Sequence, residues 1–219
     1  MKKKNVIISV VCSVFFIMCV GAGIILFPKV KEENIAYSTS IEDLFDKEGH
    51  FYVYFNRKEC PYCDNIKEDI KNFKQGNEVY EIDAEACKGT RNYDWDSHEK
   101  KYDVEIGEKD STGKIMFYDG MNENLIKEKY PPIFYKVIWA NENYAALHEG
   151  KEAGKVYAVS THPYIKKEEL NKDKFVLGGV PTLVEFENHK VINFYFDDKE
   201  IIEFLESDTQ PLDKYWNLD

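Results

Sequence analysis

The sequence predicts an α/β fold that is preceded by a membrane-spanning helix and interrupted by a long insertion. Three patterns support this fold class. A strand–helix–strand pattern occupies residues 41–83, strands followed by a helix return in residues 164–219, and an uncharged apolar run lies near the N-terminus. Of the 219 residues, 43% are hydrophobic and 15% are aromatic, which is enough for one sizeable packed domain together with a membrane segment.

The apolar run near the N-terminus is long enough to cross a membrane. Three lysines at positions 2–4 precede 22 uncharged residues at 6–27, and about 20 apolar residues cross the hydrocarbon as a helix. Lysines that flank such a helix stay in the cytoplasm. Residues 1–28 are therefore interpreted as an uncleaved signal anchor and residues 29–40 as a polar tether, with all that follows outside the cytoplasm. A signal peptide cleaved near 21–23 is the alternative.

The first half of the predicted domain covers residues 41–83. Ser40 has the side chain and position of a helix N-cap. Residues 51–55 are aromatic or β-branched throughout and predict a strand that is buried on both faces. A helix follows, with Pro61 at its first position, and residues 78–83 predict the next strand. One face of this helix is predicted from apolar spacing and consists of Tyr62, Ile66, Ile70 and Phe73.

The remainder divides into an insertion and the second half of the domain. Residues 84–163 are too many for a loop inside a compact domain, and they contain strand-like pieces at 115–118, 134–139 and 156–159. We therefore interpret 84–163 as a folded insertion. Residues 164–219 form the second half, with a hairpin of strands and a closing amphipathic helix. These elements are expected at 182–186, 191–196 and 199–205.

Cys60 and Cys63 form a C-x-x-C pair between the first strand and the helix. Such a pair can bind a metal, close a structural disulfide or exchange electrons with another thiol. A helix N-terminus favours a thiolate, so we expect the pKa of Cys60 to lie moderately below its free value of about 8.5. Arg57 and Lys58 support this lowering and Glu59 opposes it. Cys63, one turn into the helix, is expected to be more buried and to resolve a mixed disulfide formed at Cys60.

These cysteines and a proline far downstream carry a resemblance to a known family. A strand leading into Cys60-Pro61-Tyr62-Cys63, followed much later by Gly178-Gly179-Val180-Pro181-Thr182, resembles the thioredoxin superfamily. The resemblance implies a central mixed sheet flanked by helices. It also implies a cis peptide bond before Pro181, packing of Pro181 against the cysteine pair, and contacts of Pro61, Tyr62 and the backbone of Val180 with substrate.

The match is closest to membrane-anchored thioredoxin-like proteins of Gram-positive bacteria, some of them labelled bacteriocin transport accessory proteins. The chain departs from the family pattern at two places. Residues 57–59 replace the tryptophan that the family has before the first cysteine, and Tyr54 stands where the family has a buried acid.

The expected function is a membrane-anchored, extracytoplasmic thiol-disulfide oxidoreductase that acts on protein thiols or disulfides and needs no cofactor or metal. Nucleic acid is excluded as a partner, because the residues after the anchor have a formal net charge of −14 and would repel phosphates. The direction of exchange and the redox partner stay open.

Three alternatives to thiol exchange remain. The first is a structural disulfide, and the second is a zinc site completed by Cys87 and His98. The third is a secretion or assembly adaptor that binds through the insertion. The five histidines are expected at the surface or in loops; they are His50, His98, His148, His162 and His189.

Overall fold

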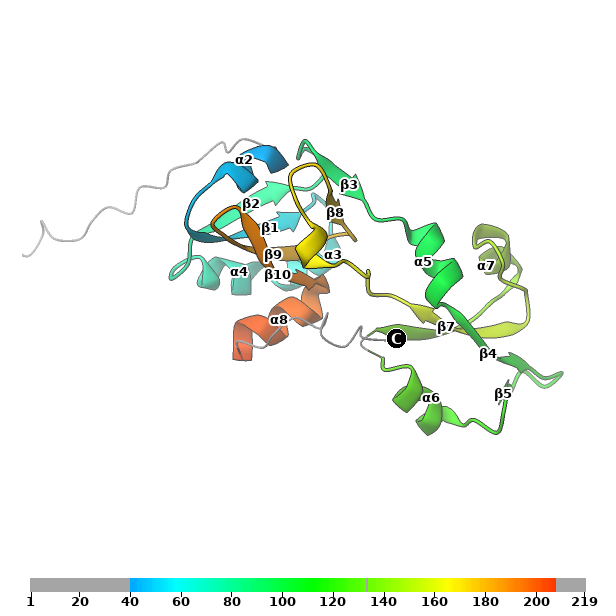
Figure 1. Ribbon diagram of the computed structural model, residues 1–219. Coiled ribbons are helices and arrows are strands. Elements are labelled where there is room, and N and C mark those ends of the chain that lie inside the picture. Colours follow the sequence, from blue (N-terminus) through cyan, green and yellow to red (C-terminus); the bar gives the residue numbers. More distant parts are fainter. Residues whose placement is uncertain (1–39, 133, 208–219) are drawn as a thin grey trace, which may run out of the picture. The chain divides into compact units, whose positions relative to one another are not determined.

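The computed structural model describes residues 40–132 and 134–207. The predicted anchor at 1–28 lies outside these residues, as does the predicted tether except for Ser40. Among the helices that are described, none is both long enough and apolar enough to cross a membrane. The described residues form a mixed α/β structure with two four-stranded sheets and one two-stranded sheet (Figure 1).

The first sheet joins the two halves of the domain that the sequence predicts. Its strand order is β10-β9-β1-β2, where β1 and β2 are parallel and the other neighbours are antiparallel. All five residues at 51–55 are buried, as expected for a central strand. The strands are β1 (His50–Asn56), β2 (Val79–Asp83), β9 (Thr182–Glu187) and β10 (Lys190–Phe196).

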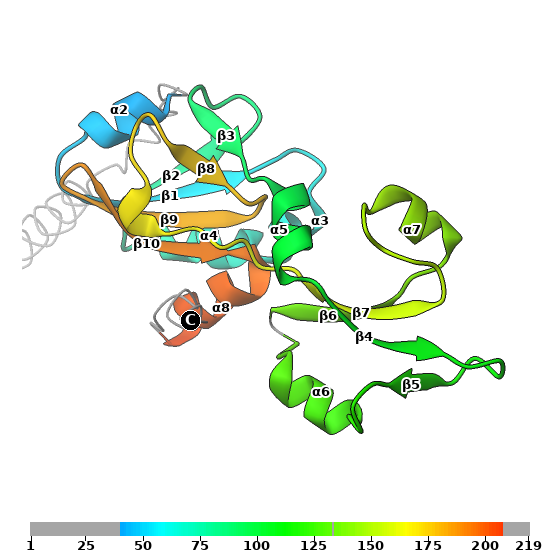
Figure 2. The same ribbon diagram turned by 45° about the vertical axis from the view of Figure 1, so that its right-hand side comes forward.

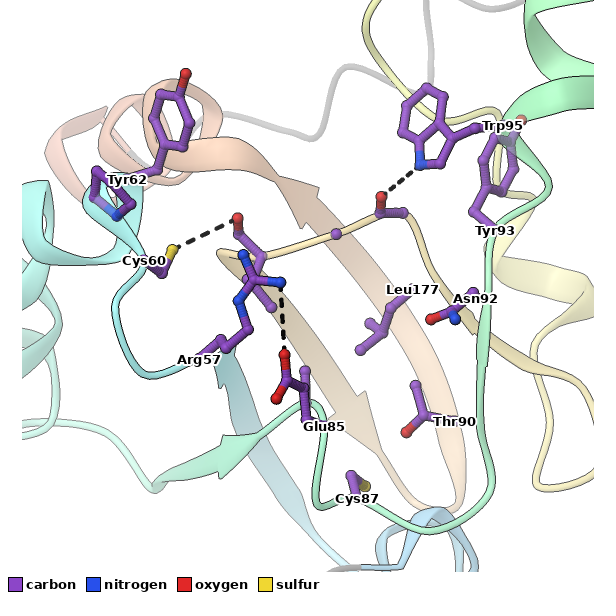
Figure 3. Close-up of a pocket in the computed structure, with 15 residues that line it drawn as sticks. Arg57, Cys60, Tyr62, Glu85, Cys87, Thr90, Asn92, Tyr93, Trp95 and Leu177 are labelled. Carbon is purple, nitrogen blue, oxygen red and sulfur yellow. Dashed lines mark hydrogen bonds and ion pairs between the residues drawn. The ribbon is translucent and has the colours of Figure 1, made fainter. Parts of the chain in front are cut away.

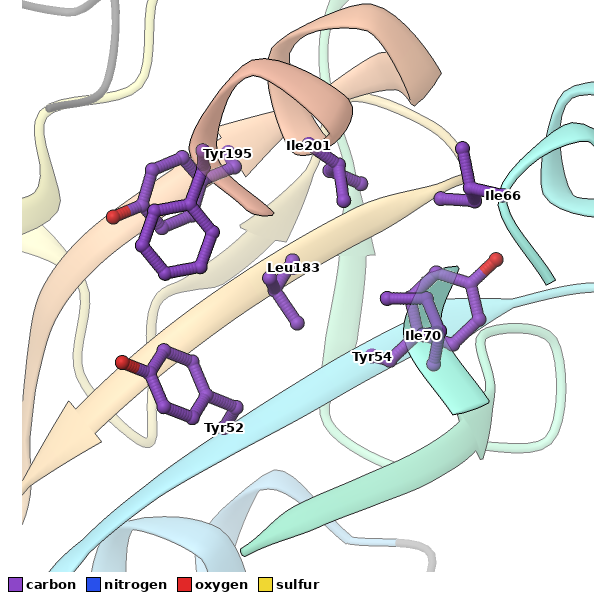
Figure 4. Close-up of a cluster of buried hydrophobic side chains, with 8 residues drawn as sticks. Tyr52, Tyr54, Ile66, Ile70, Leu183, Tyr195 and Ile201 are labelled. Atoms are coloured by element: carbon purple, nitrogen blue, oxygen red, sulfur yellow. The ribbon is translucent and has the colours of Figure 1, made fainter. Parts of the chain in front are cut away.

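Three helices cover one face of this sheet: α3 (Pro61–Asn65), α4 (Lys67–Phe73) and α8 (Asp197–Ser207). Because side chains alternate along a strand, β1 presents Tyr52 and Tyr54 to this face. Figure 4 shows the resulting cluster between the sheet and the helices. Its buried members are Tyr52, Tyr54, Ile66, Ile70, Leu183, Tyr195, Ile201 and Phe204.

The opposite face is covered by α2 (Ile41–Asp46) and by the two-stranded sheet (Figure 2). The predicted N-cap of α2 is confirmed, because the Ser40 hydroxyl accepts a hydrogen bond from the Glu42 N–H at 3.2 Å. The two-stranded sheet pairs β3 (Thr90–Asn92) with β8 (Phe175–Leu177) in parallel. Aromatic rings of Phe45, Phe51, Phe175 and Phe186 pack on this side.

Residues 84–163 contribute a second four-stranded sheet, which is antiparallel and ordered β5-β4-β7-β6. One apolar cluster packs Ile126 of α6 against it, and another packs Tyr144 of α7. The short 3₁₀ helix η1 (Lys167–Glu169) lies between β7 and β8 in the chain. The elements of this region are α5 (Trp95–Tyr102), β4 (Val104–Lys109), β5 (Ile115–Phe117), α6 (Glu123–Lys129), β6 (Tyr135–Trp139), α7 (Glu142–Leu147) and β7 (Lys155–Ser160).

The predicted single helix after Pro61 is wrong in one respect. The helix is broken at Ile66, whose φ of −108° and ψ of 9° are not helical, so the apolar spacing does not continue through the break. Ile66 and Ile70 are buried as predicted, whereas Tyr62 is 55% exposed. Tyr62 lies in the first turn of α3, on the opposite side of the break, and is therefore free to face the site at the helix mouth.

Candidate functional site

Cys60 and Cys63 lie where β1 passes into α3, and they form a disulfide with an S–S distance of 2.14 Å. Cys60 is the N-cap of α3, and its sulfur accepts a hydrogen bond from the Cys63 N–H at 3.1 Å. Pro61 occupies the first turn, where no intrahelical hydrogen bond needs its missing N–H. The local sequence therefore directs a backbone donor at the Cys60 sulfur, which favours negative charge on that atom.

Charged side chains around Cys60 largely offset one another. The guanidinium of Arg57 lies 3.6 Å from the Glu85 carboxylate, and both side chains are more than half exposed. An exposed pair of this kind contributes only about 0–1 kcal/mol to stability.

The backbone just before Cys60 is unusual. Glu59 has a φ of 61°, a left-handed conformation that costs about 1–2 kcal/mol for a residue other than glycine. The hydrogen bond from Cys63 is thus the most specific interaction that supports a Cys60 thiolate.

The loop before β9 faces Cys60. The Val180–Pro181 peptide bond is cis, as the family resemblance implies, and the Val180 carbonyl oxygen lies 3.8 Å from the Cys60 sulfur. In the disulfide this sulfur carries no proton, whereas a Cys60 thiol has one to donate to that oxygen. The Trp95 indole N–H donates to the Gly178 carbonyl at 2.9 Å, and the Thr182 hydroxyl donates to the Gly179 carbonyl at 2.8 Å. The loop is therefore held at several points beside the sulfur.

A cleft of about 770 Å³ opens next to Cys60 (Figure 3). Four of the predicted site residues line it: Cys60, Pro61, Tyr62 and Val180. Pro181, another of the six predicted site residues, is buried and lines a smaller hollow of about 260 Å³ that also includes Tyr62 and Val180. The structure therefore brings the predicted substrate-binding residues together around the disulfide.

Cys63 faces a different cavity, of about 330 Å³. The expectation that Cys63 is the more buried cysteine is wrong, because Cys60 is 3% exposed and Cys63 is 8% exposed. The loop that includes Val180 covers Cys60. The position of a cysteine in its helix does not reveal this cover, because the loop is far away in the sequence. What distinguishes the two sulfurs is which cavity each one borders.

Sequence reasoning missed the residues on the far side of the large cleft. Tyr93 lines it from the segment between β3 and α5, and Trp95 lines it as the first residue of α5. Cys87, considered from the sequence only as a zinc ligand, lines it as well. Cys87 is a buried free cysteine, and burial raises the pKa of its thiol. Trp95 lies 83 residues from its partner Gly178, and no short-range pattern in the sequence reports that contact. The pairing of β3 with β8 brings the two segments together.

The geometry does not favour the predicted zinc alternative. His98 uses both ring nitrogens, one with the Tyr93 hydroxyl and one with the Ser160 hydroxyl, each at 2.8 Å. Within the described parts of the chain, no group of three or more His, Cys, Asp or Glu residues is arranged to hold a metal ion. The expectation that all five histidines lie at the surface or in loops is wrong for His98, which is buried within α5. His162 is buried too, although it lies in a loop as expected.

The arrangement can store two electrons, because one disulfide becomes two thiols when it is reduced. Cys60 borders a cleft large enough for a segment of another chain, and a backbone carbonyl and a backbone N–H approach its sulfur. Neither a protein-family model, nor a curated protein, nor a solved structure matches this chain.

Proposed function

We propose that this protein is a thiol-disulfide oxidoreductase that exchanges electrons with protein cysteines through Cys60 and Cys63. One observation carries the proposal. The Cys60 sulfur lies between the Cys63 N–H and the Val180 carbonyl, and it borders a cleft of about 770 Å³. A disulfide with a purely structural role has no need of a cleft beside one sulfur.

The fold supports the same proposal. We assign the first sheet and its helices to a thioredoxin-like fold, with residues 84–163 as an insertion between its halves. The mixed sheet flanked by helices and the cis bond before Pro181 agree with this assignment. The predicted anchor at 1–28 would hold the domain on the extracytoplasmic side of the membrane, where disulfides persist.

In the oxidising direction, a substrate thiolate attacks the Cys60 sulfur. A bond forms between the substrate sulfur and Cys60, and the bond between Cys60 and Cys63 breaks, so that its electron pair leaves on Cys63 as a thiolate. A second substrate thiolate then attacks the substrate sulfur of this mixed disulfide. The substrate becomes a disulfide, and Cys60 leaves as a thiolate. The reducing direction runs through the same mixed disulfide in reverse order.

The lining and size of the cleft support a protein segment as the substrate. Its lining combines rings, polar side chains and the backbone around Val180, and its volume of about 770 Å³ is within the range of sites that enclose a whole ligand. A cysteine in an extended segment can lay its sulfur against Cys60 while its neighbours contact Tyr62 on one side and Trp95 on the other. Cys63 borders the other cavity and is the resolving cysteine.

The test is a trapping experiment with Cys63→Ala. This substitution leaves Cys60 free to form mixed disulfides but removes the thiol that resolves them, so partners should accumulate on Cys60. Non-reducing electrophoresis followed by mass spectrometry identifies both the partner and the cysteine that holds it. We expect adducts at Cys60 that disappear on reduction.

The matched control is the Cys60→Ala/Cys63→Ala double variant, which retains Cys87. Because Cys87 lines the same cleft, adducts through Cys87 would be mistaken for exchange if only one variant were analysed. The double variant should trap nothing. Equal trapping by both variants, or none by Cys63→Ala, would overturn the proposal.

A second candidate function is binding to a secretion or assembly partner, with the cysteines incidental. The observation that favours it is a set of exposed apolar side chains on the sheet of the insertion, including Val137 and Trp139 on β6. Replacing both Cys60 and Cys63 by serine separates the two candidates. An adaptor keeps its cellular phenotype in this variant, whereas an oxidoreductase loses it.

A further inference from the structure

The cavity beside Cys63 contains a polar group that no step described so far uses. Tyr54 projects from β1 into the cluster that contains Ile66 and Ile70 (Figure 4), and it lines the same 330 Å³ cavity as Cys63. The Tyr54 side chain is buried, with a residue exposure of 4%. Its hydroxyl has no hydrogen-bond partner among the described residues.

A buried hydroxyl without a partner is unfavourable, and phenylalanine would fill the apolar cluster equally well. The group in this cavity that changes between redox states is the Cys63 sulfur. In the disulfide it is uncharged and a weak acceptor, whereas after the disulfide opens it is a thiol or a thiolate, and a thiolate accepts strongly. The hydroxyl therefore lacks a partner in the oxidised state and has an obvious one in the reduced state.

We propose that the Tyr54 hydroxyl donates a hydrogen bond to the Cys63 thiolate when the disulfide opens, directly or through one water in the shared cavity. This inference rests on the proposed thiol exchange. The cavity has the volume and the polar lining that a bridging water needs. Tyr54 is thus a positioning residue that stabilises the Cys63 thiolate in two steps. In one, Cys63 is the leaving group when the disulfide opens, and in the other it is the nucleophile that resolves the mixed disulfide at Cys60.

Charged groups around the cavity do not supply this stabilisation by themselves. Three cations and three anions line it: Arg57, Lys58 and Lys67, and Asp64, Glu81 and Asp83. Of these, Glu81 forms an ion pair with Lys74 at 2.8 Å. Because the formal charges of the lining balance, a neutral donor in the same cavity as the Cys63 sulfur has a role that the surrounding charges leave unfilled.

The phenol keeps its proton throughout the exchange. Burial, together with the negative charges of Glu81 and Asp64, raises the pKa of Tyr54 well above its ordinary value. It is therefore a hydrogen-bond donor and not a base. When a substrate thiolate attacks Cys60, the electron pair of the broken bond moves to Cys63, and the Tyr54 hydroxyl stabilises that charge. When the Cys63 thiolate attacks Cys60 in the mixed disulfide, the pair returns and the hydrogen bond is lost.

The test compares Cys60→Ser with Cys60→Ser/Tyr54→Phe, in which Cys63 is a free thiol. Titration of the thiolate absorbance at 240 nm reports the pKa of Cys63, after subtraction of a Cys60→Ser/Cys63→Ser variant. A hydrogen bond to a charged group contributes enough for a shift of about tenfold or more in the ionisation constant. We therefore expect the pKa of Cys63 to rise by about one unit or more without the hydroxyl.

Tyr52→Phe in the Cys60→Ser background is the matched control. Tyr52 lies on the same face of β1, but its hydroxyl donates to Glu185 at 2.9 Å and does not line the cavity. Its removal should lower the stability of the protein and leave the pKa of Cys63 unchanged. Tyr54→Phe should have the opposite pattern in the disulfide form, with stability equal or higher because an unpartnered buried hydroxyl is removed.

Failure of this inference is distinguishable from failure of the proposed function. An unchanged pKa of Cys63 on removal of the Tyr54 hydroxyl overturns the role of Tyr54, whether or not the protein exchanges thiols. If removal of the Tyr54 hydroxyl raises the pKa of Cys63 but the wild-type protein reacts with no substrate, the Tyr54 contact is real and the proposed function is wrong. A second readout is the exchange equilibrium with glutathione at a pH above the pKa of Cys63, where the reduced protein holds the thiolate and Tyr54→Phe should shift the protein about tenfold towards the disulfide.

Discussion

At the scale of single residues, the loop beside Cys60 depends on a position that has no room for a side chain. A methyl group on Gly178 would lie 2.4 Å from Cγ of Pro163 and 3.2 Å from Cε2 of Phe196. A proline ring cannot rotate away, so either the loop or Pro163 must move. We expect Gly178→Ala to lower the free energy of unfolding by about 1–3 kcal/mol and to slow thiol exchange, since the shift reaches Val180. Urea unfolding and stopped-flow exchange measure the two effects.

Gly76→Ala is the control for that substitution. Nothing lies within 4 Å of a methyl group at this position, which follows α4 on the surface. This variant should be neutral or more stable by up to about 1 kcal/mol, because alanine restricts the unfolded chain. Equal stabilities for Gly178→Ala and Gly76→Ala would show that the loop accommodates a methyl group at Gly178 without strain.

A second prediction at this scale concerns Trp95, which holds the same loop through its indole N–H. Trp95→Phe keeps an aromatic ring but leaves the Gly178 carbonyl without this donor. We expect a loss of about 1 kcal/mol in stability and slower exchange, measured as above. Trp139→Phe is the control, because Trp139 is half exposed on β6 and phenylalanine keeps a ring face for Lys109. An exchange rate reduced equally in both variants would mean that the Trp95 hydrogen bond does not position the loop.

At the scale of elements, α5 is docked onto β7 through a histidine that is held neutral. His98 is 2% exposed. Burial, followed by the nearby charge of His162, lowers the pKa of His98 from 6.5 to about 4. The His98 ring hydrogen-bonds through Nδ1 to the Tyr93 hydroxyl and through Nε2 to the Ser160 hydroxyl, and a neutral ring donates through one nitrogen and accepts through the other. Protonation removes this acceptor.

This arrangement predicts a dependence of stability on pH. Between pH 6.5 and about 4 the unfolded chain binds a proton at His98 that the folded chain does not bind, so stability is complete above pH 6.5 and is lost as the pH falls through this window. The shift corresponds to about 3 kcal/mol. Urea unfolding at several pH values measures it. His98→Gln should be less stable at pH 7.5, and its free energy of unfolding should no longer fall with pH in this window. If the free energy still falls as steeply, other groups cause the pH dependence.

Elements with a strong local pattern were predictable from the sequence. The buried run at 51–55, the hairpin at 182–196 and the strand-like pieces at 115–118 and 156–159 all correspond to strands. Apolar alternation and turn residues act over a few positions and report directly on such elements. By contrast, β3 and β8 have three residues each, too few for a pattern.

The candidate site divides in the same way. The cysteine pair and the Val180–Pro181 loop carry motifs, and they were found. Trp95 belongs to the site because of one hydrogen bond to a residue far away in the chain. Such features depend on tertiary contacts between distant segments, and residue types alone do not report them.

At the scale of the whole molecule, the charge distribution predicts which substrates react faster. The chain has a formal net charge of −11, and at low ionic strength this field reaches beyond the site, since the Debye length is about 30 Å at 0.01 M salt. Close to Cys60, the cations Arg57 and Lys58 are offset by Glu59 and Glu85. The net field should therefore dominate the approach of a peptide and favour basic sequences.

The measurement uses two peptides with the same residues next to a single cysteine, one flanked by lysines and one by glutamates. Electrostatic steering changes association rates by about tenfold or more, so the basic peptide should reach Cys60 about ten times faster at low salt. The ratio should fall towards one in 1 M salt, where the Debye length is about 3 Å. A faster reaction of the acidic peptide would mean that Arg57 and Lys58 outweigh the net charge. In that case Arg57→Gln/Lys58→Gln should reverse the preference, which identifies the local cations as the cause.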